Sequence, residues 1–253
     1  TMALFESGNP TLSEKMFDKA GHAQANAEGT MSVRGTMNKF GLMLIGVIAG
    51  AGYTWHLIDQ NNPSLAQTLM IVGVIGGLIT ALAISFKPNW APALAPAYAI
   101  LEGLFLGAIS KVFNDAFYPG IVVQAVGLTF GVAVAMFLLY NFRVIKPTEK
   151  FRSMIMSATL GIAIFYLLTW VLGLFGVDVS FVRDNSMLSI GISLFIVAIA
   201  ALNLILDFEM IEQGAQRGAP QFMEWYAAFG LMVTIVWLYL EILRLLSKLS
   251  SRD

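Results

Sequence analysis

Met187–Leu206 reads MLSIGISLFIVAIAALNLIL, a stretch without a single charge, and the next residue is Asp207. About 20 consecutive apolar residues suffice for a helix that crosses a bilayer. Six further stretches have this length and character. The expected spans are 39–58, 66–86, 94–112, 121–142, 153–174, 187–212 and 222–246. The sequence therefore predicts an all-α polytopic membrane protein, a bundle of seven transmembrane helices in the lipid bilayer.

The composition agrees with this prediction and excludes several classes of function. Of 253 residues, 57% are hydrophobic and 12% are charged, whereas about a quarter of a soluble domain is charged. The chain has no cysteine and two histidines, which excludes disulfides, zinc–thiolate sites and thiol catalysis. A net charge of −1 gives no sign of nucleic-acid binding. Because no protease, hydrolase or phosphate-binding motif is present, we expect neither an enzyme nor a bound cofactor.

The distribution of polar and basic residues predicts the domains and the orientation. Residues 1–38 are polar and form a predicted cytoplasmic N-terminal tail, in which Thr11–Ala20 could fold as a short surface helix; residues 39–250 form the membrane domain. With the N-terminus inside, ten of the fifteen basic residues lie on the inner side, four of them in the loop 143–152. The excess of basic residues inside and the odd number of spans predict an outer C-terminus.

Small residues indicate where helices approach one another. Three Gly-x-x-x-Gly pairs start at Gly46, Gly103 and Gly127, and such pairs let two helix backbones pack closely in a membrane. Pro96 is expected in the first turn of the third span, where a proline is tolerated.

Two carboxylates at membrane depth are the leading functional candidates, because burying a charge in a membrane is costly and usually serves a function. Asp207 is expected roughly 8 Å from the inner end of its span, and Glu102 roughly 12 Å from the inner end of the third span. Two such groups close together would share a proton near neutral pH. Losing that proton would favour helix separation or cation entry. The alternative is a hydrogen bond that only serves helix packing.

Three further carboxylates have less specific roles. Glu241 precedes Arg244 by three residues, a spacing that favours a local ion pair. Glu209 and Glu212 follow Asp207 toward the inner surface, where we expect them to be solvated. They could form an acidic cytoplasmic vestibule that attracts cations.

Three parts of the chain resemble the Bax inhibitor-1 / YccA family, in its bacterial branch. They are Tyr98–Gly107 (YAILEGLFLG), the late-span Asp207, and Trp237–Leu246 (WLYLEILRLL). The resemblance implies a seven-helix bundle with the last helix in the centre and a pH-sensitive calcium leak. In the family, a hydrogen-bonded pair of aspartates on helices six and seven controls the leak. One bacterial member modulates a membrane-bound AAA protease.

Asp207 matches the helix-six aspartate of that pair, but its partner is ambiguous. The preceding Leu-Tyr-Leu maps the partner to Glu241, whereas the distance to Arg244 maps it to Thr234. Depth favours Thr234, since Glu241 should lie roughly 10 Å farther out than Thr234. With a threonine there, Glu102 becomes a candidate replacement partner for Asp207.

The leading interpretation is a passive calcium or general cation leak, gated by pH through Asp207 with Glu102 or Glu241. The alternative is a non-conducting regulator or partner of a membrane protease or stress-response pathway. Deleting residues 2–36 would distinguish the two, because a leak should survive the deletion and a partner interaction should not.

Overall fold

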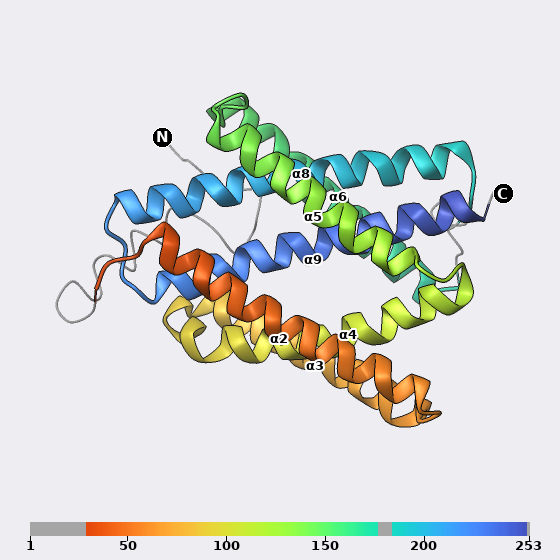
Figure 1. Ribbon diagram of the computed structural model, residues 1–253. Coiled ribbons are helices and arrows are strands. Elements are labelled where there is room, and N and C mark those ends of the chain that lie inside the picture. Colours follow the sequence, from red (N-terminus) through yellow and green to blue (C-terminus); the bar gives the residue numbers. More distant parts are fainter. Residues whose placement is uncertain (1–28, 177–183, 252–253) are drawn as a thin grey trace. The chain divides into compact units, whose positions relative to one another are not determined.

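A computed structural model describes residues 29–176 and 184–251 (Figure 1). The surface helix predicted at Thr11–Ala20 lies outside these residues. The helices run as follows: α2 (Val33–Asp59), α3 (Pro63–Phe86), the short η1 (Pro88–Trp90), α4 (Ala91–Ala116), α5 (Ile121–Asn141), α6 (Glu149–Leu174), α8 (Met187–Gln216) and α9 (Met223–Ser250). The only β structure in the described ranges is an isolated bridge between Thr30 and Pro220.

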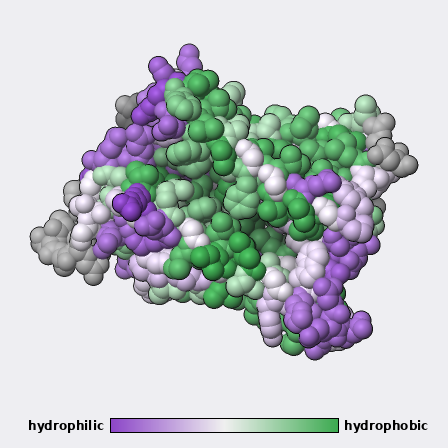
Figure 2. Space-filling model, viewed as in Figure 1, coloured by the Kyte–Doolittle hydropathy of each residue, from purple (hydrophilic) through white to green (hydrophobic). Residues whose placement is uncertain are grey.

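Seven of the described helices, counting η1 and α4 as one, are long and apolar enough to cross a membrane. Large apolar side chains such as Ile45, Ile79 and Leu167 are more than half exposed, and apolar surface covers much of the face seen in Figure 2. Lipid is the solvent that such surfaces require. The chain is thus a multi-pass, all-α membrane protein, as the sequence predicts.

Several helices extend beyond the apolar stretches that predict them. Helix α2 begins at Val33 rather than 39, because the Ser32 hydroxyl caps it by accepting a bond from the Gly35 amide at 2.9 Å. Helix α4 begins at Ala91, so Pro96 lies inside the helix and not in its first turn as predicted. Without an amide hydrogen, Pro96 cannot donate the helical bond to the carbonyl one turn earlier.

The chain divides into two compact units. Of the described residues, unit 1 holds 117–176, 184–208 and 234–251, and unit 2 holds 29–116 and 209–233. Helices α8 and α9 each contribute one part to each unit. Unit 1 is otherwise built from α5 and α6, and unit 2 from α2, α3 and α4.

Backbone contact between α2 and α4 is the main feature of unit 2. A Cβ atom on Gly50 would lie 2.6 Å from the carbonyl oxygen of Ile100, and one on Gly103 or Gly107 would collide with the carbonyl of Val47 or Ala51. Two of the three predicted glycine pairs therefore pack against each other. The third prediction is wrong, because no atom lies within 4 Å of a Cβ added to Gly127 or Gly131.

A second close approach in unit 2, between α3 and α4, was not predicted. A Cβ on Gly73 would lie 2.6 Å from the carbonyl oxygen of Leu101, and one on Gly77 would lie 3.3 Å from a carboxylate oxygen of Glu102. Helix α4 is thus packed against glycines of both α2 and α3, side by side with them in Figure 1.

The segment before α2 is fastened to the connection between α8 and α9. The Met31 amide donates to the Ala219 carbonyl at 2.7 Å. The amide and hydroxyl of Ser32 donate to Glu224 at 2.8 and 2.9 Å, and Lys39 forms an ion pair with the same carboxylate. Glu224 is 3% exposed, so its charge is satisfied by these donors rather than by water.

The core of unit 1 is apolar and joins α6 to α8. Its buried members are Ile155, Ile162, Ile196, Ile199 and Leu206, and Trp237 of α9 packs against them. Helix α9 is the most buried of the spans, with 67% of its apolar window inside the protein against 11% for α6.

Candidate functional site

Asp207 is completely buried in unit 1, with 0% exposure. Helix α8 continues to Gln216, so Asp207 lies about 14 Å from the helix end, deeper than the 8 Å expected. The next residue, Phe208, packs edge-on against Phe137 at a ring distance of 5.4 Å. An acidic group in such surroundings is expensive to keep, which favours a functional role.

One helical turn before Asp207, Asn203 adds a second polar group to the same face of α8. Its side-chain amide donates to the Thr159 hydroxyl of α6 at 2.8 Å and to the Ile199 carbonyl at 2.9 Å. Its Oδ1 atom is buried and has no hydrogen-bond partner among the described residues. A buried acceptor without a partner is uncommon and needs an explanation.

Contacts between α8 and α9 fix which residue of α9 lies at the level of Asp207. Lys248 donates to Ser189 at 2.7 Å and to Ser193 at 2.8 Å. The two helices are antiparallel, so moving back along α9 corresponds to moving forward along α8. From this anchor, Thr234 lies about 3 Å and Glu241 about 14 Å from the level of Asp207.

Contacts through α6 give the same result independently. Tyr166 contacts Glu241, and Thr159 contacts Asn203. Thr159 precedes Tyr166 by the same seven residues by which Thr234 precedes Glu241, and α6 and α9 run in the same direction. Thr234 is therefore level with Asn203 and about 6 Å along the axis from Asp207. Both routes place Thr234, 3% exposed, nearer to Asp207 than Glu241.

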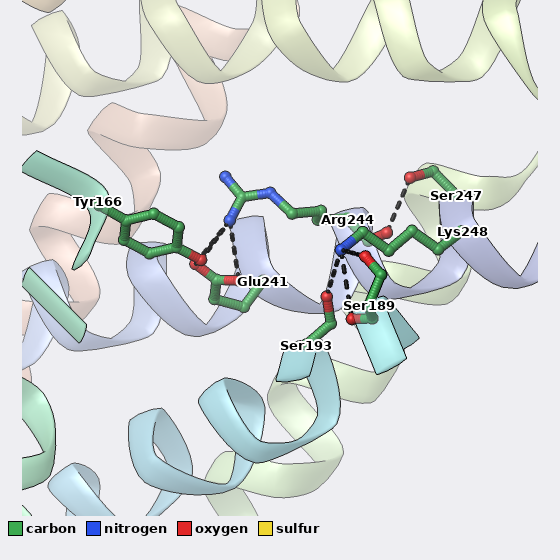
Figure 3. A network of polar contacts seen from close by, with 7 residues as sticks. All are labelled: Tyr166, Ser189, Ser193, Glu241, Arg244, Ser247 and Lys248. Atoms are coloured by element: carbon green, nitrogen blue, oxygen red, sulfur yellow. Dashed lines mark hydrogen bonds and ion pairs between the residues drawn. The ribbon is translucent and has the colours of Figure 1, made fainter. Parts of the chain in front are cut away.

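Glu241 belongs instead to a polar cluster nearer the end of α9, drawn in Figure 3. Its carboxylate is 2% exposed. It accepts from the Tyr166 hydroxyl at 2.8 Å and pairs with Arg244 at 3.1 Å. The predicted local ion pair is confirmed. The guanidinium also lies over the Tyr166 ring, 5.1 Å from its centre.

Lys248 lies one turn beyond Arg244 and, like Glu241, is buried, at 6% exposure. Its ammonium is held by the hydroxyls of Ser189 and Ser193, as Figure 3 shows. The sequence alone does not single out Tyr166, Ser189 or Ser193. The four-residue spacing of the two serines, which places them on one face of α8, was the available signal.

The remaining predicted site residues lie in unit 2. Glu102 is half-buried on α4, beside Gly77 of α3, and the Tyr98 hydroxyl forms a hydrogen bond with it. Glu102 and Asp207 fall in different units, so their pairing stays a prediction. Glu209 is 9% exposed and bonded to Gln213 at 3.1 Å. The expectation that Glu209 is solvated is therefore wrong, while Glu212 is half-buried and bonded to Gln216 at 3.2 Å.

Residues 9–251 match the family described as Bax inhibitor 1 like. The chain belongs to the Bax inhibitor 1-like family. No curated protein matches it. The match covers every described helix, and so it includes Asp207, Thr234, Glu241 and Arg244.

Within the described residues, no three His, Asp or Glu side chains gather as a metal site. Asp207, Thr234 and the Oδ1 atom of Asn203 are oxygen-bearing groups of the kind that hard cations accept.

Proposed function

We propose that this Bax inhibitor 1-like protein is a passive, pH-sensitive leak path for calcium or other cations, without enzymatic activity. The pH dependence comes from Asp207. Glu102 is retained as a candidate partner for it. We further propose that the protein lies in a bacterial plasma membrane with the N-terminus in the cytoplasm and the C-terminus outside.

The observation that carries this proposal is the complete burial of Asp207 in a membrane helix of a chain that belongs to this family. A carboxylate at this depth is charged or neutral depending on pH, and the charged form attracts cations. Thr234 and Asn203, within about 6 Å along the helix axis, supply uncharged oxygens at the same level. Hard cations such as calcium are bound by such oxygens.

The apolar core of unit 1 supplies the closed state. Ile162 and Ile199 lie between the level of Asp207 and the level of Glu241. Ile155 lies at the level of Asp207, and Ile196 at that of Glu241. Hydrophobic constrictions of this kind stop ion flow by excluding water. A change of charge at Asp207 would act directly on the helix that contributes Ile196 and Ile199.

The test is calcium-dye flux into proteoliposomes that contain the full chain, at neutral and acidic pH. Asp207→Asn removes the charge and keeps the shape, so we expect it to flatten the pH response. Asp115→Asn is the matched control, because Asp115 is 53% exposed and pairs with Lys111 at the end of α4.

Equal fluxes for Asp207→Asn and the parent at every pH would contradict the role of Asp207. No flux above empty liposomes from folded protein would contradict the leak itself, and would favour the non-conducting regulator.

A further inference from the structure

One nitrogen of Arg244 occupies a position surrounded by three oxygens. Its Nη1 atom lies 2.5 Å from the hydroxyl oxygen of Tyr166 and 3.1 Å from both carboxylate oxygens of Glu241. The three oxygens come from two helices, α6 and α9, and converge on this single atom. A guanidinium that only paired with a carboxylate would align two nitrogens with the two oxygens, whereas here one nitrogen is shared among all three.

This oxygen arrangement is one that a calcium-like cation accepts. Calcium binds carboxylates through one or both oxygens, at about 2.3–2.6 Å, and completes its shell of 6–8 ligands with other oxygens and water. Glu241 offers both oxygens and Tyr166 offers one. The Arg244 side chain is 40% exposed, so the cluster is open on the side where further ligands would be needed.

The burial of Glu241 makes some cation necessary at this position. The carboxylate side chain is 3% exposed, and a buried charge without a partner is strongly destabilising. If the guanidinium leaves, another cation must take its place or the carboxylate must accept a proton. Arg244 has a long side chain at the exposed edge of the cluster, so its guanidinium can move away from Glu241 without unfolding α9.

Lys248 does not compete for this position. Its ammonium is held one turn away by Ser189 and Ser193, and no ion pair joins it to Glu241 in the described part of the chain. Its charge weakens cation binding at Glu241 by repulsion, but it leaves the three oxygens free for a single occupant.

We propose that Glu241 and Tyr166 form a cation-binding site for a calcium-like divalent ion, and that Arg244 is a tethered occupant that the ion must displace. The choice of calcium rests on the proposed function, whereas the site itself rests on the geometry. The site would be the second carboxylate position of unit 1, on the other side of the apolar core from Asp207.

The test is calcium titration of the purified full chain by calorimetry. Arg244→Gln removes the tethered charge, and we expect it to bind calcium at least about tenfold more tightly than the parent, because the buried carboxylate then lacks its occupant. Arg244→Lys keeps a cation and should bind as weakly as the parent. Arg143→Gln is the matched control, since Arg143 also lies over a tyrosine ring, 5.5 Å from the centre of Tyr140.

Two double variants test the ligands. Glu241→Gln combined with Arg244→Gln should abolish the gain in binding, and Tyr166→Phe combined with Arg244→Gln should reduce it. A folded Arg244→Gln protein that binds calcium no better than the parent would overturn the proposal, as would a gain that persists without Glu241.

The calcium-binding experiment and the flux experiment can contradict their two proposals independently. If Asp207→Asn leaves flux unchanged but Arg244→Gln gains calcium binding, the site stands and the proposed function falls. If flux depends on Asp207 but Arg244→Gln gains nothing, the cluster is a structural ion pair only.

Discussion

The helices within each of the two units are packed by a different kind of contact. In unit 2, α4 packs on α2 and α3 through glycines, with backbone against backbone. In unit 1, α6, α8 and α9 are joined by an apolar core and by side-chain hydrogen bonds among Tyr166, Glu241, Arg244, Lys248 and two serines. Glycine contacts have one geometry and cannot adjust, whereas bonds between long side chains can exchange partners. We therefore expect unit 2 to be the rigid part of the protein. Unit 1 is the part in which side-chain bonds can rearrange.

The largest effect should come from filling the glycine contact. Gly103→Leu places a side chain against the backbone of Val47, which cannot move aside, so we expect a loss of about 3 kcal/mol or more and little folded protein. Gly127→Leu is the matched control, since open space surrounds that position. Yield of monodisperse protein in detergent measures both. Equal yields of Gly103→Leu and Gly127→Leu would contradict the claim that unit 2 depends on its glycine contacts.

A smaller loss is expected where unit 2 does depend on a charge. Glu224→Gln leaves Lys39 without its ion pair and weakens the acceptor for Ser32. We expect a destabilisation of about 2 kcal/mol, measured by chemical unfolding in micelles. No change in unfolding would show that the fastening of residues 30–32 is dispensable.

In unit 1 a substitution should change function more than stability. Thr234→Asp introduces a second carboxylate near the level of Asp207, and two acids that share a proton titrate as a pair. We expect a steeper dependence of flux on pH than in the parent, while Thr234→Asn should keep the parental profile. Identical profiles for the three proteins would place Thr234 outside the path.

The smallest effect is expected at the end of α4. Lys111 pairs with Asp59 and Asp115, both about half exposed, and exposed ion pairs contribute little. Lys111→Gln should leave the thermal unfolding midpoint close to that of the parent. A large drop would mean that unit 2 relies on surface charge as much as on its glycines.

The fold was predictable because a bilayer imposes a length and a composition on every span. The helix ends were not, since capping by Ser32 and the continuation of α8 to Gln216 depend on local contacts outside the apolar stretches. Glycine spacing identified the contact of α2 with α4 but misassigned Gly127, because spacing describes one face of a helix and not what lies opposite it.

The candidate site was predictable only in part. Asp207 and the Glu241–Arg244 pair follow from sequence, the first from its isolation and the second from spacing within one helix. Tyr166, Ser189 and Ser193 do not, because their partners are 55 to 75 residues away along the chain. Neutral hydroxyls are also common in membrane helices and carry no signal until the register is known.

The hydrogen bonds from Ser32 to Glu224 have a consequence for folding during synthesis. The two residues are 192 positions apart, and a ribosome adds about 5–20 residues per second. Helix α2 therefore waits roughly 10–40 s before Glu224 is synthesised. During that interval Lys39 lacks its ion pair with Glu224, and Ser32 lacks its acceptor. The docking of α2 is thus completed only when the last helix, α9, has been made.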